Sequence, residues 1–235
     1  MGQNTSSAVM AQRREPPDSL DYFPTPPWAT RALCEHLLAH DEPLADMVCA
    51  EPACGEGHMA RPLDEYFDQV RPGDIFDYSA TWPGQHIVAD FTGSDTELYT
   101  ATGGLDWVIT NPPFKVAEQF IDIACRMACR GVGMLVRSAF LEGVGRHDRL
   151  FSKNPPSRIL QFCERVPMHK GRLTATGSTA TSYCWLVWID GDFVGDEPQT
   201  TFHWIPPCRA RLERPGDYIN PGEAADRGPL FGGGL

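Results

Sequence analysis

Short apolar runs recur along the chain, and each ends at a polar or turn-forming residue. We therefore expect buried strands at residues 47–52, 70–75, 86–90, 105–110, 131–137, 158–164 and 181–190. A helix is expected at residues 58–68, and apolar side chains at helical spacing predict an amphipathic helix at 115–129. Strands that alternate with helices favour an α/β fold built on a mostly parallel sheet.

The length of 235 residues is typical of one folded domain, which we place at residues 20–205. Residues 1–19 lack an apolar signal core and are expected to form a disordered arm. Residues 206–235 are rich in Pro and Gly and are expected to form a surface tail. Since no apolar run approaches the roughly 18–20 residues of a membrane span, a cytoplasmic protein with no membrane contact is predicted.

The formal net charge of −11 argues against a nucleic-acid partner, but the charge is unevenly distributed. Residues 111–172 contain 11 Lys and Arg against 5 Asp and Glu, whereas residues 1–110 contain 5 against 18. A basic central third favours a surface suited to a polyanion. The alternative is a solvated charge pattern that serves no partner.

Eight cysteines are present, and none forms a CxxC pair. Several lie inside apolar runs, so buried free thiols in a reducing compartment are expected. Cys34, His36 and His40 resemble half of a metal-ligand set. Because the other half is not visible in the sequence, no metal site is predicted.

Four predicted strands end in polar side chains, namely Glu51, Asp74, Asp90 and Asn111. In an open α/β sheet, ligands bind outside the carboxyl ends of the strands, near the point where the strand order reverses. The residues that end these strands are therefore the first candidates for a binding site.

The stretch after the first strand, EPACGEGH, suits a nucleoside ligand. Gly55 and Gly57 allow a tight turn and close approach of a ligand to the backbone. Asp74 lies 19 residues after Gly55, near the spacing at which a carboxylate reaches a ribose hydroxyl. Asp90 and Phe91 then offer an acceptor for an exocyclic amine beside an aromatic ring. The full GxGxxG fingerprint is absent, so an adenosine group without a pyrophosphate is favoured; the alternative is that Asp74 caps a turn and Asp90 a helix.

Residues 111–114, NPPF, follow the fourth predicted strand. Prolines fix φ and have no N–H, so the Pro112 carbonyl and the Asn111 amide are preset acceptors. A planar amine could donate to both while its ring stacks on Phe114. The alternative is a rigid turn with Phe114 in the core.

Together these motifs resemble the class I S-adenosylmethionine-dependent methyltransferases, and among them the enzymes that methylate adenine N6 in DNA. The cofactor motif is matched by residues 51–57, EPACGEG, and the catalytic motif [DNS]PP[YFW] by residues 111–114. Residues 22–28, YFPTPPW, resemble the N-terminal motif, and the order of motifs fits the γ arrangement. The match covers about residues 21 to 190. It implies a Rossmann-like fold with a seven-stranded, mostly parallel sheet and helices on both faces.

The resemblance also implies S-adenosylmethionine as the cofactor. Glu51 would meet its methionine amino group, Asp74 its ribose hydroxyls and Asp90 its adenine amine. The implied cofactor-binding residues are Tyr22, Phe23, Thr25, Glu51, Ala53, Gly55, Gly57, Asp74, Ile75, Asp90, Phe91 and Asn111. The implied catalytic residues, which would hold the target base, are Asn111, Pro112, Pro113 and Phe114.

The implied reaction is in-line methyl transfer to an exocyclic nitrogen, which needs neither a metal nor a nucleophilic cysteine. A base inside duplex DNA must be flipped out to reach such a site. The basic candidates for contacting the phosphates are Lys115, Arg137, Arg146, Arg149, Lys153, Lys170 and Arg172. Arg158 and Arg165 flank a predicted strand and are interpreted as structural.

Only residues 141–157 and 165–180 are sizeable enough to recognise a target sequence. We therefore expect a DNA methyltransferase of bacterial or phage type with short or relaxed specificity, as a monomer or dimer. Several alternatives stay open: an RNA base, cytosine N4 and protein glutamine as targets, or a non-catalytic partner subunit. Ser more often opens the cytosine motif, and the glutamine enzymes usually have Tyr where this chain has Phe114.

Overall fold

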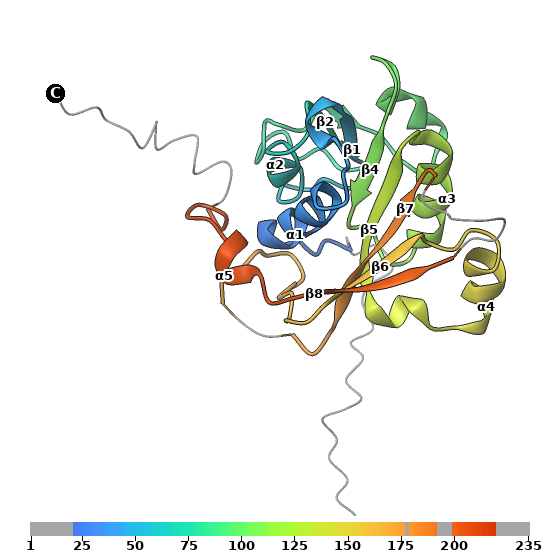
Figure 1. Cartoon of the computed structure of the whole chain (residues 1–235). Helices are drawn as coiled ribbons and strands as arrows, with labels where there is room; N and C mark the ends of the chain where they lie inside the picture. The colour runs from blue at the N-terminus through green and yellow to red at the C-terminus, as the bar shows by residue number, and fades with distance from the viewer. Residues whose placement is uncertain (1–20, 177–178, 192–198, 220–235) are drawn as a thin grey trace, which may run out of the picture.

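The structure is a computed structural model that describes residues 21–176, 179–191 and 199–219 (Figure 1). The arm expected at residues 1–19 lies outside the described residues, as does the part of the tail from residue 220 onward.

The described residues form one sheet with helices and helical turns around it. The strands are β1 (Val48–Glu51), β2 (Gln69–Asp74), β3 (Ile87–Val88), β4 (Trp107–Thr110), β5 (Gly131–Arg137), β6 (Arg158–Phe162), β7 (Tyr183–Ile189) and β8 (Thr201–Ile205). The α-helices are α1 (Pro27–Leu38), α2 (Ala60–Leu63), α3 (Ala117–Met127), α4 (Val144–Arg146) and α5 (Arg209–Leu212). The other helical turns are η2 (Leu44–Asp46), η3 (Ser94–Tyr99), η4 (Ser138–Leu141) and η5 (His147–Phe151).

The sheet is mostly parallel, as predicted, and its strand order is β3-β2-β1-β4-β5-β7-β6-β8. Strands β1 to β5 pair in parallel, and β7 runs antiparallel to both β5 and β6. The chain leaves β1 toward β2 and β3, then returns to β4 on the other side of β1. The order therefore reverses between β1 and β4, which is where open α/β sheets bind their ligands.

The expectation of seven strands was wrong, because the sheet has eight. The additional strand, β8, lies at the edge and pairs in parallel with β6. Phe202 and Trp204 on β8 are exposed, so the stretch TFHWI has no buried run that would predict a strand. An edge strand is held by backbone hydrogen bonds to a single neighbour and needs no continuous apolar run.

One helix is shorter than predicted, and another was not predicted at all. The helix expected at residues 58–68 is only four residues long, because the chain must turn back to enter β2: the Asp68 N–H already donates to the Met47 carbonyl oxygen at 3.1 Å. Helix α1 was not predicted as a helix. It begins at Pro27, a residue well suited to the first helical position because its missing N–H would have no partner there.

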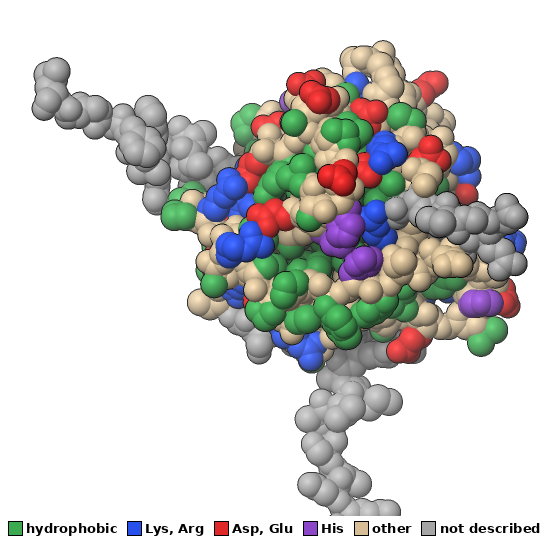
Figure 2. Space-filling model, viewed as in Figure 1, with side chains coloured by type: hydrophobic (Ala, Val, Ile, Leu, Met, Phe, Trp, Pro, Cys, Tyr) green, Lys and Arg blue, Asp and Glu red, His purple; other side chains and the backbone are tan. Residues whose placement is uncertain are grey.

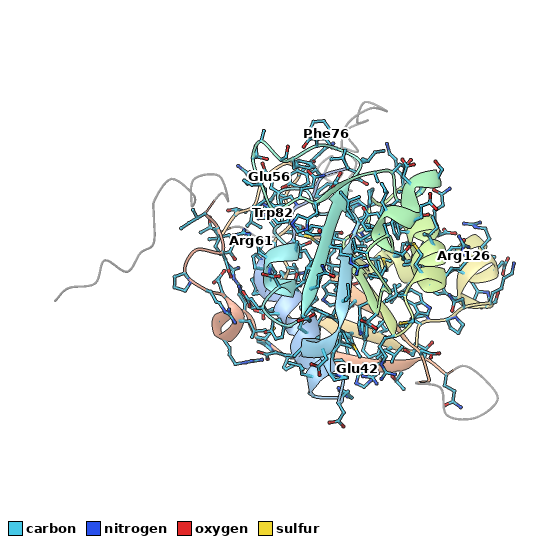
Figure 3. The ribbon with its side chains drawn as sticks, turned by 90° about the horizontal axis from the view of Figure 1, so that it is seen from above. Glu42, Glu56, Arg61, Phe76, Trp82 and Arg126 are labelled. Atoms are coloured by element: carbon cyan, nitrogen blue, oxygen red, sulfur yellow. The ribbon has the colours of Figure 1, made fainter. Side chains whose placement is uncertain are left out.

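Apolar side chains pack on both faces of the sheet, as expected. Neighbouring residues of β4 alternate between the two clusters: Trp107 and Ile109 pack in the cluster under α1 and α2, and Val108 packs in the one under α3. Figure 3 shows Arg61, in α2, and Arg126, in α3, on opposite sides of the strands. The site at the strand ends therefore rests on two packed layers.

Part of the expected tail is ordered against the domain. Helix α5 packs on α1, and the Asp217 carboxylate forms an ion pair of 2.8 Å with Arg31 of that helix. Arg31 is buried and also pairs with Glu65, at 2.8 Å. Among the described residues, no helix is long and apolar enough to cross a membrane.

Candidate functional site

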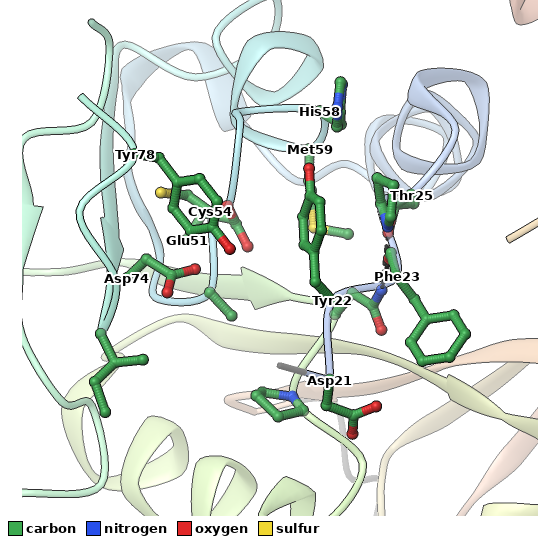
Figure 4. Close-up of a pocket in the computed structure, with 15 residues that line it drawn as sticks. Asp21, Tyr22, Phe23, Thr25, Glu51, Cys54, His58, Met59, Asp74 and Tyr78 are labelled. Carbon is green, nitrogen blue, oxygen red and sulfur yellow. Dashed lines mark hydrogen bonds between the residues drawn. The ribbon is translucent and has the colours of Figure 1, made fainter. Parts of the chain in front are cut away.

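The four polar strand ends converge at the point where the strand order reverses. Glu51 ends β1, Asp74 ends β2, and Asp90 and Asn111 follow β3 and β4. Figure 4 shows the carboxylates of Glu51 and Asp74 pointing into one pocket, with the ring of Tyr22 facing them. The structure thus brings together residues that are far apart in the sequence.

Two adjoining cavities occupy this region. The first, of about 90 Å³, lies between Glu51, Asp74, Asn111 and the N-terminal segment at residues 21–25. The second, of about 300 Å³, extends past Asp90. The predicted cofactor residues that line the first are Tyr22, Phe23, Thr25, Glu51, Ala53, Asp74, Ile75 and Asn111; those that line the second are Ala53, Asp74, Ile75, Asp90 and Phe91. Because three of these residues line both, the cavities form one elongated site over the end of β2.

Glu51 is 1% exposed and has one unsatisfied oxygen. The Thr110 hydroxyl donates to its Oε1 at 2.9 Å, whereas the buried Oε2 has no hydrogen-bond partner among the described residues. Burial raises the pKa of this carboxyl well above its usual value of 4.5, and the neighbouring Asp74 adds to the rise. A positively charged donor that reached Oε2 would satisfy the oxygen and stabilise the charge.

Asp74 holds the glycine-rich loop in place. Its Oδ2 accepts from the Gly55 N–H at 3.0 Å, and its Oδ1 accepts from the Phe76 N–H at 3.0 Å. Burial raises the pKa of this carboxyl as well. Each carboxylate oxygen has a second lone pair, so Asp74 can accept from a ligand hydroxyl while it anchors the loop.

Both glycines of the loop have positive φ, +49° at Gly55 and +76° at Gly57. A Cβ atom at Gly55 would lie 2.5 Å from the ring of Tyr22, and one at Gly57 would lie 2.4 Å from the ring of Trp82. Gly55 therefore lets Tyr22 close over the site. Gly57 contacts protein, and its partner Trp82 was not apparent from the sequence.

Asp90 and Phe91 take positions that differ in character. Asp90 Oδ1 accepts from the N–H and the hydroxyl of Thr92, at 2.8 and 2.7 Å, so this carboxylate caps its own turn as well as lining the second cavity. Phe91 is only 1% exposed, and its ring packs on Tyr99 and Phe120 at 5.4 and 4.9 Å. The ring of Phe91 is thus chiefly a core side chain.

The Asn111 amide is oriented by three acceptors. Its Nδ2 donates to the Phe23 carbonyl oxygen at 2.8 Å and to the Thr25 hydroxyl at 3.1 Å, and lies 3.7 Å from the Met168 sulfur. A carbonyl can only accept, so this contact fixes which amide atom is nitrogen. The remaining atom, Oδ1, is buried and finds no donor in the part of the chain that is described. Asn111 therefore presents one acceptor to an incoming N–H.

Phe114 is held beside Asn111 by contacts from three directions. Its N–H donates to Asp21 Oδ2 at 2.7 Å, and its ring lies 5.2 Å from that of Phe23. The guanidinium carbon of Arg137, one of the predicted basic residues, lies 3.9 Å from the Phe114 ring centroid. A flat group could stack here only by sharing this ring with Arg137 or displacing it.

The N-terminal segment at residues 21–25 forms one wall of the first cavity. The Tyr22 hydroxyl donates to Glu56 at 3.2 Å, and the Tyr22 carbonyl oxygen accepts from the Gly171 N–H at 2.9 Å. Burial raises the pKa of Tyr22. The residues of the first cavity that the sequence analysis missed include Asp21, Cys54, His58, Met59 and Tyr78. His58 had a signal in the sequence, since it directly follows Gly57. In the structure, His58 Nε2 lies 3.7 Å from Glu56 Oε2, and this contact lowers the pKa of Glu56.

Three of the predicted basic residues line a groove that begins at Phe114. They are Lys115, Arg146 and Arg149, around a cavity of about 510 Å³. The two arginines pair with Glu118, at 3.3 and 3.0 Å, so their charges are partly balanced. The other predicted basic residues that are exposed are Arg137, Lys153, Lys170 and Arg172. The structure thus gathers part of the predicted basic set beside the NPPF motif.

Comparison with known proteins gives no matching family model and no matching curated protein. The solved structures that are similar to this chain include two with TM-scores above 0.5. One is the modification subunit of a putative type I restriction enzyme from Vibrio vulnificus (TM-score 0.53, 14% identity), a likeness that covers 87% of this chain and 51% of that one. The chain therefore spans about half the length of that subunit. The other is a putative RNA methyltransferase from Pyrococcus horikoshii (TM-score 0.54, 14% identity), with coverage of 75% and 90%.

At this level of identity the likeness concerns the fold. The strand order and the helices on both faces of the sheet agree with it. The chain has the Rossmann-like class I methyltransferase fold, with eight strands in its sheet.

Proposed function

We propose that this protein transfers a methyl group from S-adenosylmethionine to the N6 amino group of an adenine flipped out of DNA. The observation that carries the proposal is the buried Oδ1 of Asn111, which has no hydrogen-bond partner among the described residues and belongs to a side chain that lines the first cavity. An acceptor buried in this way suits a planar amine, and an amine bound to it would lie next to the proposed cofactor cavity.

The first cavity and its surroundings fit the methionine and ribose parts of the cofactor. The unsatisfied Oε2 of Glu51 suits the methionine amino group, and Asp74 suits the ribose hydroxyls. The second cavity suits the adenine ring, with Asp90 near its amine and the exposed side chain of Ile75 over its face. The class I methyltransferase fold, which the chain shares with a putative RNA methyltransferase, supports S-adenosylmethionine as the cofactor.

S-adenosylmethionine would supply a methyl group bonded to a positively charged sulfur. The residues of this chain orient the acceptor. Asn111 Oδ1, and by the expected geometry the Pro112 carbonyl, would hold the two N–H bonds of the amine and turn its lone pair toward the methyl group. Formation of the N–C bond would accompany cleavage of the S–C bond, whose electron pair would stay on sulfur, and the amine would release one proton to solvent. The bonds from Asn111 Nδ2 to Phe23 and Thr25 keep the amide from rotating during this step.

DNA as the substrate is supported by the groove beside Phe114. Lys115, Arg146 and Arg149 line it and could contact phosphates on either side of a flipped base. One structural neighbour is described as the modification subunit of a restriction enzyme. An RNA base is the second candidate, favoured by the likeness that covers 90% of a putative RNA methyltransferase.

The proposal is tested by incubating the protein with tritiated S-adenosylmethionine and duplex DNA, single-stranded DNA, RNA or protein, followed by nucleoside analysis. We expect label in DNA, recovered as N6-methyladenine. Asn111→Ala should abolish transfer, since the amide would hold the target amine. Label confined to RNA would favour the second candidate. The absence of N6-methyladenine from DNA would refute the proposal, and the absence of any methylated base from RNA would refute the second candidate.

A further inference from the structure

Three histidine rings meet at the end of α1 that faces away from the methyl-transfer site. His36 lies in the last turn of α1, His40 follows that helix, and His203 lies on the edge strand β8. The ring centroids are 4.2 Å apart for His36 and His40, 5.1 Å for His36 and His203, and 5.7 Å for His40 and His203. Figure 2 shows histidine side chains side by side on this face of the molecule.

We propose that His36, His40 and His203 form a site for a divalent transition metal, with Zn²⁺ as the best fit. One ring nitrogen from each histidine lies within 4.8 Å of the others. Three imidazoles are a donor set that suits Zn²⁺, Ni²⁺ or Cu²⁺, whereas Mg²⁺ and Ca²⁺ prefer oxygen ligands. Three protein ligands also leave a position for water or another small ligand.

Two of the rings are oriented by hydrogen bonds of the kind that support metal-binding histidines. His40 Nδ1 lies 2.7 Å from the His36 carbonyl oxygen, which can only accept, so this nitrogen carries the proton. His203 Nε2 lies 2.9 Å from the Thr201 hydroxyl, which donates its own proton to the Ser157 carbonyl oxygen at 3.1 Å. The hydroxyl therefore accepts from His203 Nε2. In each ring the lone pair is left on the other nitrogen.

The end of α1 favours a cation, and the geometry needs only a small adjustment. The C-terminal end of a helix carries a partial negative charge, which favours a metal ion beside the last turn of α1. With Zn–N bonds of roughly 2.1 Å, tetrahedral geometry requires nitrogens about 3.4 Å apart. His40 is exposed, so its ring can rotate to close the distance that remains.

The site would act on the fold and not on methyl transfer. From Thr25 at the methyl-transfer site to His36 the chain advances 11 residues, mostly in α1, which at 1.5 Å per residue is about 16 Å. A bound metal would tie β8, the strand paired with β6 alone among its described neighbours, to the helix that begins at the cofactor pocket. The Cys34, His36 and His40 pattern in the sequence was thus half of a set that β8 completes, with His203 as the third ligand in place of Cys34.

The test is a Zn²⁺ titration of the full, untagged chain against a chromophoric chelator, combined with melting curves and with Co²⁺ absorption spectra. We expect one Zn²⁺ per chain, a higher melting temperature with Zn²⁺, and the visible absorption bands of a four- or five-coordinate Co²⁺ site. His203→Gln and His40→Gln should each weaken binding at least tenfold. His86→Gln, which changes an exposed histidine outside the cluster, should leave binding unchanged.

His203→Gln distinguishes the three-histidine site from a weak pair of histidines four residues apart. Unchanged affinity in this variant would overturn the proposal, as would the absence of saturable Zn²⁺ binding by the parent protein. If His203→Gln fails to fold, His40→Gln decides, because its exposed side chain lies beyond the end of α1. Equal losses in His40→Gln and His86→Gln would also overturn the proposal, because they would mean non-specific surface binding.

Discussion

Two buried oxygens, Oε2 of Glu51 and Oδ1 of Asn111, distinguish the proposed site at the level of single residues. Leaving a buried acceptor without a partner costs roughly 1–3 kcal/mol. Both atoms lie in side chains that are otherwise well held, by Thr110 in one case and by Phe23 and Thr25 in the other. The unsatisfied oxygens thus belong to side chains that hydrogen bonds hold in fixed orientations, which favours a ligand-binding role over a purely structural one.

Replacing Glu51 with Gln should separate ligand binding from stability. The amide keeps the shape but loses the charge that attracts the methionine ammonium group. We expect S-adenosylmethionine to bind about 10- to 100-fold more weakly, measured by calorimetry, since a charge-assisted hydrogen bond contributes roughly 1.5–3 kcal/mol. Unchanged affinity would remove Glu51 from the cofactor site.

The stability of Glu51→Gln relative to the parent should also depend on pH. The folded-state pKa of Glu51 is raised above 4.5, so the folded protein binds more protons than the unfolded chain at pH values above 4.5. The contribution of this group to stability is therefore complete below its unfolded pKa and is lost as the pH rises through the folded pKa. Glu51→Gln should gain stability relative to the parent as the pH rises above 4.5, in urea unfolding without cofactor. A constant difference across that range would contradict the shift.

At the scale of elements, the turn after β1 depends on packing that only the fold reveals. Gly57→Ala would place a side chain at positive φ, which should lower the free energy of unfolding by roughly 1–2 kcal/mol. The new Cβ would also clash with the ring of Trp82, which should lower it by about 1–3 kcal/mol more. Gly171 has a similar φ of +71°, and a Cβ there would have no neighbour within 4 Å. Gly171→Ala should therefore lose only the stability that the positive φ costs. Chemical unfolding of the two variants measures the difference; equal losses would mean that Trp82 moves away freely.

The sequence predicted the strands that end in functional residues better than it predicted the helices. Strands β1 and β4 are buried runs that stop at Glu51 and just before Asn111, so hydrophobicity and turn chemistry mark the same boundary. The short α2 and the edge strand β8 depend on pairing with distant segments, such as Asp68 with Met47 and Phe162 with Ile205. Local patterns do not contain those contacts.

The candidate site was predictable to the extent that its chemistry follows strand ends. Asp74, Asn111 and Ala53, which were candidates from the sequence, line the two cavities. The packing of Phe91 in the core and of Arg137 over Phe114 was not predictable, because each depends on the registers of neighbouring strands and loops. His58 and Tyr78 likewise reach the pocket only through the folded loop.

At the scale of the whole molecule, the segment after β8 is part of the folded unit. Asp217→Ala would leave the buried Arg31 with Glu65 as its remaining carboxylate, and we expect the free energy of unfolding to fall by about 3 kcal/mol. Arg126→Ala removes an exposed pair with Asp122 and should cost less than about 0.5 kcal/mol. Losses of similar size in the two variants would mean that the tail contributes little.

The uneven charge of the molecule predicts how its affinity for DNA depends on salt. An acidic protein that binds through a local basic groove should lose affinity steeply as salt rises. Lys115→Ala should weaken binding to all DNA sequences alike and reduce the slope of log K against log salt by about 1, whereas Arg211→Ala, an exposed residue of α5 paired with Glu35, should change neither. Fluorescence anisotropy over a salt series measures both. A parent protein whose DNA affinity is independent of salt would contradict the role of the groove.

The most direct test of the central claim is mass spectrometry of nucleosides from duplex DNA incubated with S-adenosylmethionine and either the parent protein or Asn111→Ala. N6-methyladenine should accumulate with the parent and be absent with the variant. N6-methyladenine that forms equally with both proteins, or with neither, would contradict the assignment of Asn111 as the residue that holds the target amine.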